Sequence, residues 1–463
     1  MDLKNIQLST FKRAYFVGVG GIGMSALARY FKSLGWDVSG YDKTPSVLTK
    51  SLESEGILIH FEDLGESIPM QFKEKDSTLV IYTPAIPKNH GELNFFQENN
   101  FQLFKRSQVL GLLTHNSKGL GVAGTHGKTT TSTLLAHILN ESSVKCDAFL
   151  GGISSNFNSN LITSSNAKYT VIEADEFDRS FLQLSPFASI ITSTDADHLD
   201  IYGDASSLLE GFQQYANLTH KDGFLIVRKG LKITSVAKSW TYAVEDLSAD
   251  YVAVNLRFTH GQFLFDVKFP EGEWKDVEFG LPGIHNAENA LACIALTQKL
   301  GLTENEIRFG LKTFKGVKRR FEYQVKSLNL VYIDDYAHHP TEIKALISSV
   351  RMLYPNQKIT GIFQPHLFSR TRDFFDDFVK ELSKLDEVIL LPIYPAREEP
   401  IPGITSDLIF EKLSLKNKFL FSPKEALEHI KSVNEGVVLT IGAGDIDRII
   451  DAIKEIVLSN IQV

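Results

Sequence analysis

Short apolar runs rich in β-branched and aromatic residues recur along the chain, and segments with helical periodicity separate them. Three of these runs begin at Ala14 (AYFVGVG), Gly119 (GLGVAGT) and Asn329 (NLVYIDD). Near-continuous apolar runs that alternate with helices are typical of parallel strands covered by helices on both faces. This pattern therefore predicts an α/β fold class built on parallel sheets.

Each apolar run ends in a cluster of polar residues. In chain order the clusters are TPA, GTHGKT, EADE, DADH, DDYAHH, QPH and GAGD, from Thr83 to Asp445. Ligands of open α/β sheets bind outside the carboxyl ends of the strands. An ordinary strand–helix turn explains one or two such clusters, but their repetition along the chain favours binding sites.

The length of the chain, 463 residues, suggests about three domains at ~100–200 residues each. LLTHNSKG from Leu112 and GVKRRFEYQ from Gly316 are the candidate linkers. We expect a Rossmann-like N-terminal domain, a central α/β domain like those of P-loop ATPases, and a Rossmann-like C-terminal α/β domain. Strands alternate without a helical pattern over residues 222–279, which predicts an antiparallel excursion in the central domain. The expected domains are residues 1–113, 114–319 and 320–463.

Composition excludes several classes of protein. The net charge of −8 argues against a nucleic-acid partner, because a phosphate backbone needs a basic surface. Cys146 and Cys293 lack metal-ligand spacing and indicate a reducing compartment. The N-terminus has no apolar signal-peptide core, and no apolar run reaches the ~18 residues of a membrane helix. We therefore expect a cytoplasmic protein, a monomer or weak dimer, that binds no nucleic acid and no membrane.

The first glycine-rich loop, GVGGIG, follows a predicted strand and precedes a predicted helix. Gly18, Gly20 and Gly23 fit the pattern G-x-G-x-x-G, and Asp42 follows the next strand. Glycine lets the backbone approach a pyrophosphate, and a helix N-terminus adds partial positive charge. The loop predicts a site for a dinucleotide or another diphosphate-linked ligand, although a tight strand–helix turn would also use these glycines.

The second loop, GTHGKTTT from Gly124, also joins a predicted strand to a predicted helix. Lys128 can reach the β- and γ-phosphates of a nucleotide, and Thr129 or Thr130 can offer a hydroxyl to Mg²⁺. Val122 stands where the usual P-loop has its first glycine, so this is a shortened variant. We expect it to bind a nucleoside triphosphate.

Carboxylates follow the next two predicted strands. Oxygen ligands with an occasional imidazole suit Mg²⁺ or Mn²⁺ near phosphates. The alternative for a single aspartate at a strand end is helix capping; for Glu173 and His198 we favour metal binding. The candidate ligands are Glu173, Asp175, Glu176, Asp195, Asp197 and His198.

Taken together, these motifs resemble the Mur ligases, the ATP-dependent family that forms amide bonds in peptidoglycan synthesis. The resemblance implies that ATP phosphorylates the lactyl carboxylate of UDP-N-acetylmuramate and that the amine of L-alanine attacks the acyl phosphate. It thus assigns the first loop to the UDP-sugar and the second to ATP. The matching stretches are residues 16–28 (FVGVGGIGMSALA), 123–131 (AGTHGKTTT), 173–182 (EADEFDRSFL), 195–203 (DADHLDIYG), 283–292 (GIHNAENALA), 314–322 (FKGVKRRFE), 334–343 (DDYAHHPTEI), 363–378 (FQPHLFSRTRDFFDDF) and 398–403 (EEPIPG).

The resemblance also implies residue roles around ATP. Thr129 and Glu173 would hold one Mg²⁺, and Glu173 and His198 a second near the acyl phosphate. Arg319 or Arg320, with Arg319 favoured, would reach the γ-phosphate, and Asp334 or Asp335 the ribose. Lys128, His198, His338 and Arg319 would act in catalysis. The implied ATP-binding residues are Gly124, Thr125, His126, Gly127, Lys128, Thr129, Thr130, His285, Asn286, Asn289, Arg319 and Asp334.

For the other two substrates the resemblance implies separate sites. Arg370 would bind the carboxylate of L-alanine, and His338 would orient its amine or take its proton. Leu367 stands where the family often has a basic residue that would contact a carboxylate or phosphate. Arg370 and Arg372 are therefore the stronger candidates for that contact. The amino-acid site would comprise Tyr336, His338 and Arg370. The UDP-sugar site would comprise Gly18, Gly20, Gly21, Ile22, Gly23, Asp42, Thr83, Pro84, Ala85 and His126.

Three other functions stay open at this point. A dehydrogenase would explain the first loop and Asp42, but it does not explain the motifs GTHGKTTT, EADE and DADH. A recycling ligase of the same family attaches a whole tripeptide, although its first loop usually departs from the GIGMS seen here. A binding protein without catalysis is the third, and the combination of Lys128, Glu173, His198 and Arg370 argues against it.

Overall fold

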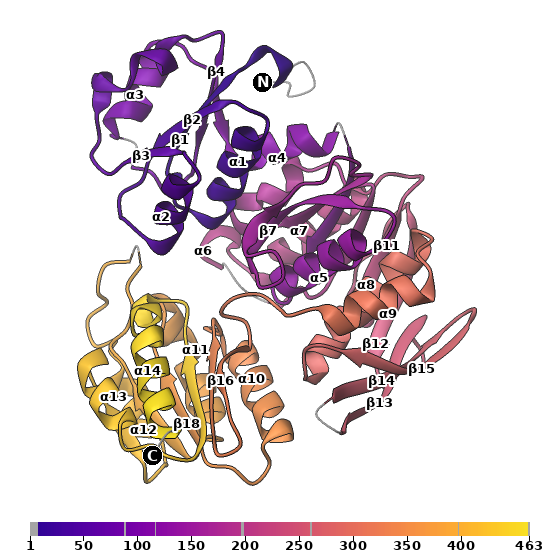
Figure 1. The fold of residues 1–463 in the computed structure, drawn as a ribbon, viewed down its shortest axis with the longest axis vertical. Coiled ribbons are helices and arrows are strands. Elements are labelled where there is room, and N and C mark those ends of the chain that lie inside the picture. Colours follow the sequence, from indigo (N-terminus) through magenta and orange to yellow (C-terminus); the bar gives the residue numbers. More distant parts are fainter. Residues whose placement is uncertain are drawn as a thin grey trace. The chain divides into compact units, whose positions relative to one another are not determined.

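Three β-sheets organise the chain (Figure 1). The computed structural model describes residues 8–87, 89–115, 117–195, 199–259, 262–396 and 398–461. Contacts divide the chain into two units. The first comprises Met1–Arg257, Leu264–Gly280 and Ala287–Lys315, and the second Phe258–Phe263, Leu281–Asn286 and Gly316–Val463.

The N-terminal sheet has five strands in the order β3-β2-β1-β4-β5, and all of its pairs are parallel. The chain order reverses between β1 and β4, so the crevice at their carboxyl ends is the expected ligand position. The elements are β1 (Arg13–Val17), α1 (Ile22–Ser33), β2 (Asp37–Tyr41), α2 (Val47–Ser54), β3 (Leu58–His60), β4 (Thr78–Tyr82), α3 (Gly91–Glu98), β5 (Leu103–Lys105) and α4 (Arg106–His115), with short 3₁₀ turns at Leu8–Thr10, Gly65–Ser67 and Met70–Lys73.

The central sheet has ten strands in the order β15-β14-β13-β12-β11-β10-β6-β9-β7-β8. β6 lies between β10 and β9 and is parallel to both, which sets the second glycine loop between two strand ends. The elements are β6 (Lys118–Ala123), α5 (Lys128–Glu141), β7 (Cys146–Ser154), β8 (Ser159–Ile162), β9 (Tyr169–Ala174), a 3₁₀ segment (Phe177–Gln183), β10 (Ala188–Ile191), α6 (Leu199–Tyr202), α7 (Ala205–Leu218), β11 (Phe224–Arg228), β12 (Lys238–Val244), β13 (Tyr251–Thr259), β14 (Gln262–Phe269), β15 (Gly272–Phe279), α8 (Ile284–Lys299) and α9 (Glu304–Thr313).

The predicted antiparallel excursion over residues 222–279 is wrong for its first half. β11 pairs in parallel with both β10 and β12, and β12 pairs in parallel with β13. Alternating polar and apolar residues report which face of a strand is buried but carry no information about its direction. Only two residues separate β14 from β15. A connection this short can join antiparallel neighbours but cannot join parallel ones, which need a long crossover.

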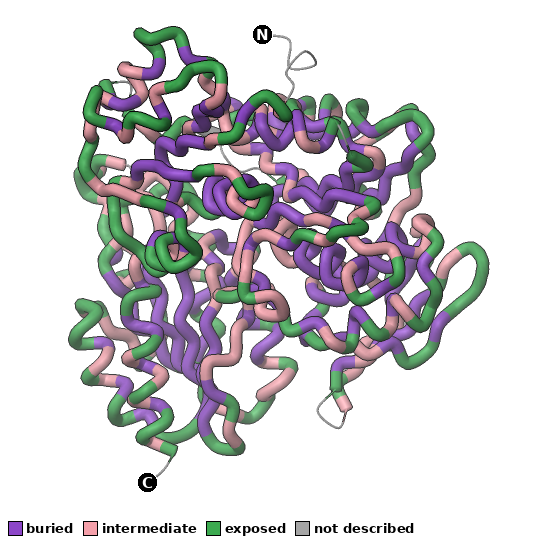
Figure 2. Tube along the Cα trace, turned by 45° about the horizontal axis from the view of Figure 1, so that its top comes forward, coloured by how far each residue is buried: buried purple, intermediate pink, exposed green. Residues whose placement is uncertain are grey.

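The C-terminal sheet has six strands in the order β16-β17-β21-β18-β19-β20, with β16 antiparallel to β17 and the rest parallel. Val331 and Ile333 pack into one apolar cluster, whereas Leu330 and Tyr332 pack into another on the opposite face. The inner strands β17, β21, β18 and β19 are accordingly almost entirely buried, whereas the edge strands β16 and β20 are not (Figure 2). The elements are β16 (Glu322–Lys326), β17 (Leu330–Asp335), α10 (Pro340–Leu353), β18 (Ile359–Phe363), α11 (Phe368–Leu382), β19 (Glu387–Leu390), α12 (Asp407–Lys412), β20 (Lys418–Leu420), α13 (Pro423–Ile430), β21 (Gly436–Ile441), a 3₁₀ turn (Asp445–Ile449) and α14 (Ile450–Ile461).

The predicted α/β class and its parallel sheets are confirmed by these three sheets. Among the described residues no helix is both long and apolar enough to cross a membrane.

Candidate nucleotide and substrate sites

The first glycine loop joins β1 to α1 at the crevice between β1 and β4. The backbone N–H of Gly20 donates to Asp42 Oδ2 at 2.7 Å. Gly18 has φ of +95°, and a Cβ there would lie 2.4 Å from Thr83 Cγ2. The glycines thus let this loop, Asp42 and the loop after β4 approach one another closely. Of the other residues expected at this site, Gly21, Pro84 and Ala85 lie in the same two loops, and Ile22 and Gly23 lie in the first turn of α1.

Arg106, the first residue of α4, also lies against this loop, and sequence reasoning missed it. A Cβ on Gly23 would lie 2.4 Å from Arg106 Nη1, and Arg106 Nη2 lies 3.1 Å from Asp175 Oδ2. The guanidinium therefore links the first loop to the acidic residues that follow β9. No motif surrounds Arg106 in the sequence, so its position could be found only from the fold.

The second glycine loop is held by residues that follow β10. Ser193 Oγ accepts a hydrogen bond from the backbone N–H of His126 at 2.8 Å and lies 2.8 Å from Thr125 Oγ1. Gly127 has φ of +83°, and a Cβ there would meet Asn289 Oδ1 at 2.8 Å. The fold thus brings Asn289 of α8 beside the loop, as expected for a nucleotide contact. Gly124, Lys128, Thr129 and Thr130 lie in the same loop and in the first turn of α5.

Lys128, at the start of α5, forms a buried ion pair. Its ammonium donates to Glu176 Oε1 and Oε2 at 2.8 and 2.7 Å and to the carbonyl oxygen of Gly124 at 2.6 Å. Burial acts to lower the pKa of Lys128, but the carboxylates of Glu176, Asp175 and Glu173 outweigh it and raise the pKa. Lys128 is therefore a charged ammonium at the position where nucleotide phosphates would lie.

The strand end of β9 supplies the oxygen ligands expected for a metal. Thr129 donates its hydroxyl to Glu173 Oε1 at 3.0 Å, and the N–H of Gly151 donates to Glu173 Oε2 at 3.0 Å. The described residues contain no group of three or more His, Cys, Asp or Glu side chains that could hold a metal. A hydroxyl and a carboxylate still fit Mg²⁺, because near phosphates this ion takes one or two protein ligands and completes its shell with phosphate and water. Two candidate ligands, Asp197 and His198, lie outside the described residues.

In the second unit, Arg319 and Asp334 contact each other. Arg319 Nε lies 3.1 Å from Asp334 Oδ2, and Arg319 Nη2 donates to the carbonyl oxygen of Gly442 at 2.7 Å. Thr440 Oγ1 donates to Asp334 Oδ1 at 2.6 Å. Burial raises the pKa of Asp334, against the lowering effect of Arg319. Both residues expected at ATP thus lie together beside the carboxyl ends of β17 and β21.

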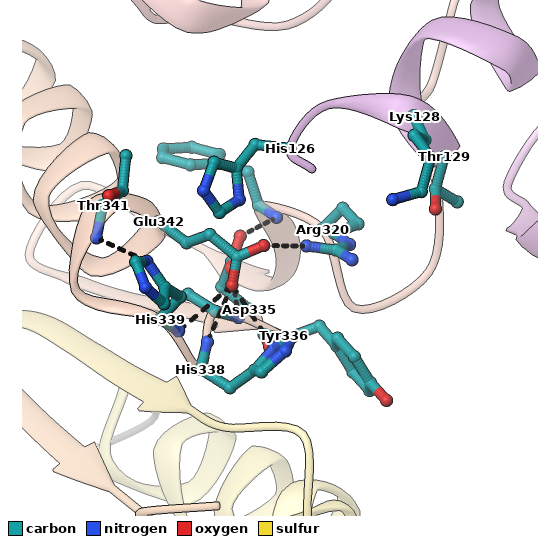
Figure 3. A network of polar contacts seen from close by, with 12 residues as sticks. His126, Lys128, Thr129, Arg320, Asp335, Tyr336, His338, His339, Thr341 and Glu342 are labelled. Atoms are coloured by element: carbon teal, nitrogen blue, oxygen red, sulfur yellow. Dashed lines mark hydrogen bonds and ion pairs between the residues drawn. The ribbon is translucent and has the colours of Figure 1, made fainter. Parts of the chain in front are cut away.

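The neighbouring pair, Arg320 and Asp335, makes different contacts (Figure 3). Arg320 Nη1 lies 3.4 Å from Glu342 Oε1. Asp335 accepts hydrogen bonds from the backbone N–H groups of Phe321 and Ala337 at 2.6 and 2.7 Å. Burial raises the pKa of Asp335 to about 6. Arg319 and Arg320 therefore diverge, one toward the strand ends and one toward α10.

The residues expected to bind the amino acid gather at the carboxyl ends of β17 and β18. The ring of His338 lies 5.4 Å from that of Tyr336 and 5.7 Å from that of His366, centroid to centroid. Arg370 Nη1, in the first turn of α11, lies 3.4 Å from His366 Nδ1. His366 was absent from the predicted site although it belongs to the quoted QPH cluster. Leu367, the N-cap residue before α11, has φ of +70°.

His285 and Asn286 open α8 in the second unit. The amide of Asn286 donates to the carbonyl oxygen of Pro282 at 2.7 Å, so this side chain folds back onto its own turn. His285 Nδ1 lies 3.5 Å from Ser349 Oγ, and burial lowers the pKa of His285 to about 4. The imidazole is therefore neutral near pH 7, which suits contact with an uncharged ring.

Three family models match the chain in sequence order. Their descriptions are the Mur ligase family, catalytic domain (residues 13–118), the Mur ligase middle domain (residues 122–297) and the Mur ligase, glutamate ligase domain (residues 319–444). Together they cover most of the chain.

Curated relatives are similar over nearly their whole length. The UDP-N-acetylmuramate–L-alanine ligase of Phocaeicola vulgatus is 51% identical over 453 residues, which are 97% of this chain and 98% of the relative. The protein of the same name from Flavobacterium psychrophilum is 50% identical over 450 residues, covering 97% of this chain and 99% of the relative.

Solved structures agree with this similarity. The UDP-N-acetylmuramate–alanine ligase of Thermotoga maritima has a TM-score of 0.81 at 29% identity and covers 97% of this chain and 99% of its own. A murein peptide ligase of Psychrobacter arcticus has a TM-score of 0.69 at 22% identity over 97% and 98% of the two chains, and so shares the fold.

Proposed function

The chain belongs to the Mur ligase family, and on that premise we propose that it joins L-alanine to the lactyl carboxylate of UDP-N-acetylmuramate with ATP as the energy source. The observation that carries this conclusion is the 51% identity, over 97% of the chain, with a relative of that activity. The predicted family and the predicted ligase activity thus agree with the relatives that the chain resembles. The product is a precursor of peptidoglycan.

A carboxylate is a poor electrophile, because attack by an amine pushes charge onto a group that is already anionic. Transfer of the γ-phosphoryl group to the lactyl carboxylate makes an acyl phosphate, whose phosphate can leave. Both states gather negative charge, so catalysis depends mainly on positioning and electrostatic stabilisation. Lys128 suits this role, because its ammonium stays charged despite burial.

Thr129 and Glu173 are the residues proposed to hold Mg²⁺, together with His198. When bound, Mg²⁺ neutralises charge on the phosphates of ATP and of the acyl phosphate. Glu173 is fixed for this task by the hydroxyl of Thr129 and the N–H of Gly151. Mn²⁺, which prefers the same ligand atoms, is the proposed substitute.

Tyr336, His338 and Arg370 are the residues proposed to bind L-alanine. Arg370 pairs with its carboxylate, and His338 contacts its amine. Support comes from the cation at Arg370 and the imidazole at His338, which both face His366. A carboxylate and an amine on one small molecule match this pair of groups.

The tripeptide-recycling ligase stays the nearest alternative, because its ATP chemistry is the same. The murein peptide ligase of Psychrobacter arcticus is only 22% identical to this chain, against 51% for the alanine ligase of Phocaeicola vulgatus. A dehydrogenase has no use for the buried Lys128–Glu176 pair or for Thr129 beside Glu173. We propose the cytoplasm as the compartment, since ATP is supplied there.

The decisive experiment measures ADP release with UDP-N-acetylmuramate, ATP and Mg²⁺ against a panel of amino acids and the tripeptide L-alanyl-γ-D-glutamyl-meso-diaminopimelate. We expect L-alanine to give the highest kcat/KM. Faster turnover with the tripeptide would establish the recycling ligase. Without an amino acceptor we expect at most one ADP per enzyme molecule, from formation of the acyl phosphate, and continuous ADP turnover under these conditions would contradict a ligase.

A further inference from the structure

Glu342, in the first turn of α10, contacts His338 of the proposed amino-acid site and its neighbours His339 and Arg320 (Figure 3). Its Oε2 accepts hydrogen bonds from the backbone N–H groups of His338 and His339 at 3.0 and 3.2 Å. The same oxygen lies 3.3 Å from His338 Nδ1, while Oε1 faces Arg320 Nη1 at 3.4 Å. A glutamate at the third position of a helix often caps its own N-terminus, but this one also reaches a side chain at the site.

The contacts of His338 Nδ1 assign its tautomer. Nδ1 lies 3.0 Å from the carbonyl oxygen of Tyr336 and 3.3 Å from Glu342 Oε2. Both of these oxygens can only accept a hydrogen bond, so Nδ1 must carry the proton in the neutral ring. The lone pair of the neutral imidazole is then on Nε2.

The charges around His338 favour an imidazole that is neutral before the reaction and protonated only during it. Burial and the cations of Arg370 and Arg320 lower the pKa of His338, whereas the Glu342 carboxylate raises it. The rings of Tyr336 and His366 complete its surroundings. A neutral imidazole can accept a proton, and a carboxylate beside Nδ1 stabilises the imidazolium that results.

Building on the proposed function, we propose that Glu342 is a positioning residue for aminolysis: it fixes the Nδ1–H tautomer of His338, so that Nε2 takes a proton from the ammonium group of the incoming amino acid. The ammonium loses one proton to Nε2 and becomes a free amine. Its nitrogen then bonds to the carbonyl carbon of the acyl phosphate while the bond from that carbon to the phosphate oxygen breaks. The electron pair leaves with the phosphate, which also takes the second proton and departs as HPO₄²⁻.

The two half-reactions depend differently on this arrangement. Formation of the acyl phosphate needs no base for an amine, so Glu342 matters only in the second step. Glu342→Gln keeps the size of the side chain but removes its charge. We expect the ADP burst with ATP and UDP-N-acetylmuramate alone to stay within about twofold of wild type, while aminolysis, measured by mixing the preformed acyl phosphate with L-alanine, slows about 10- to 100-fold.

Spectroscopy of His338 distinguishes loss of the positioning of its ring from general disruption of the fold. In protein labelled with ¹⁵N in the histidine rings, with His338 assigned by its loss in His338→Asn, the wild type should show the Nδ1–H tautomer. Glu342→Gln should lower the pKa of His338, because the carboxylate that stabilises the imidazolium is gone. Glu425→Gln is the matched control: Glu425 caps α13 in the same way, at the third position after Ser422, and contacts no residue of the site. It should change neither half-reaction.

Equal slowing of both half-reactions in Glu342→Gln, or no slowing of either, would overturn the proposal, and so would an Nε2–H tautomer in the wild type. If Glu342→Gln lacks a cooperative unfolding transition, Glu342→Asp is measured in the same way. Aspartate keeps the negative charge, but its side chain is one methylene shorter and holds the carboxylate further from His338. Selective slowing of aminolysis is again the expected result, and equal loss of both steps again contradicts it. A wild type that forms no ADP from UDP-N-acetylmuramate and ATP would instead reject the proposed function itself.

Discussion

The ammonium of Lys128 lies 2.7 Å and 2.8 Å from the two carboxylate oxygens of Glu176, although 48 residues separate them in the chain. The Glu176 side chain is almost fully buried, so this pair is shielded from water. On the proposed function, the phosphate oxygens of ATP would compete for Lys128 with a carboxylate already in contact with it. The Lys128 ammonium is thus charged and held in place by Glu176.

Removing Lys128 should affect both stability and chemistry. Lys128→Ala removes the ammonium that pairs with the buried Glu176 carboxylate, which costs about 3–5 kcal/mol of unfolding free energy. We expect phosphate release to be abolished and UDP-sugar binding to be nearly unchanged, as measured by a coupled phosphate assay and by calorimetry. The double variant Lys128→Ala/Glu176→Gln should recover most of the stability in urea unfolding but none of the turnover. Recovered turnover would remove Lys128 from the phosphate site.

Loss of the metal should stop the reaction reversibly. With a chelator present we expect no ADP release, and Mg²⁺ should restore it. Glu173→Gln removes a charge-assisted contact worth about 1.5–3 kcal/mol, so half-maximal activity should need at least about tenfold more Mg²⁺. Asp178→Asn is the control, because Asp178 pairs with Lys105 on a partly exposed surface. An unchanged Mg²⁺ requirement in Glu173→Gln would contradict the proposed metal site.

Arg370 should govern the affinity for the amino acid. Arg370→Ala loses a charge-assisted pair of about 1.5–3 kcal/mol, so the KM for L-alanine should rise about 10- to 150-fold. The KM values for ATP and UDP-N-acetylmuramate should stay close to wild type. Lys412→Ala provides the comparison, since Lys412 is half-exposed and pairs with the exposed Asp376. Equal effects of the two substitutions would show that net charge, not the Arg370 contact, is responsible.

Smaller and more polar amino acids should be poor substrates. One methyl group shifts discrimination by about 1–3 kcal/mol, so glycine should react with a kcat/KM about 10- to 200-fold below that of L-alanine. Serine should also be detectable but inferior. Equal kcat/KM for glycine and L-alanine would mean that no pocket contacts the methyl group.

The pH dependence of stability should carry the signature of Asp335. Burial raises its pKa to about 6 in the folded protein, above the ~3.9 of an unfolded chain. The folded state therefore binds more protons, and the contribution of Asp335 to stability is full below about pH 4 and is lost as the pH rises through 6. Relative to Asp335→Asn, the wild type should lose about 2–3 kcal/mol between pH 4 and pH 7. Urea unfolding of both proteins at each pH measures this difference, and parallel curves would contradict it.

Some groupings of polar clusters could be predicted because parallel strands end at one edge of their sheet. Combined with the strand order of the sheets, that rule puts GTHGKT beside EADE, because β6 neighbours β9. It puts DDYAHH and QPH on either side of β21, because β17 and β18 both neighbour β21. The tight turns at Gly18 and Gly127 could also be predicted, because glycine readily adopts the positive φ that both residues have. The antiparallel pairing expected over residues 222–279 was wrong for β11, β12 and β13, because the periodicity of a strand does not indicate its direction relative to its neighbour.

Local sequence by itself therefore determined the α/β class, the two loops and the residue types at each strand end. Only the tertiary structure decided which partner each group takes: Glu176 for Lys128, Ser193 for the backbone N–H of His126, Asp175 for Arg106 and Glu342 for His338. The first three of these contacts join residues 48 to 69 positions apart, and they depend on strand order and on where a turn leaves its strand. Neither is encoded in the local periodicity of the chain, because crossover connections, and not neighbouring residues, bring parallel strands together.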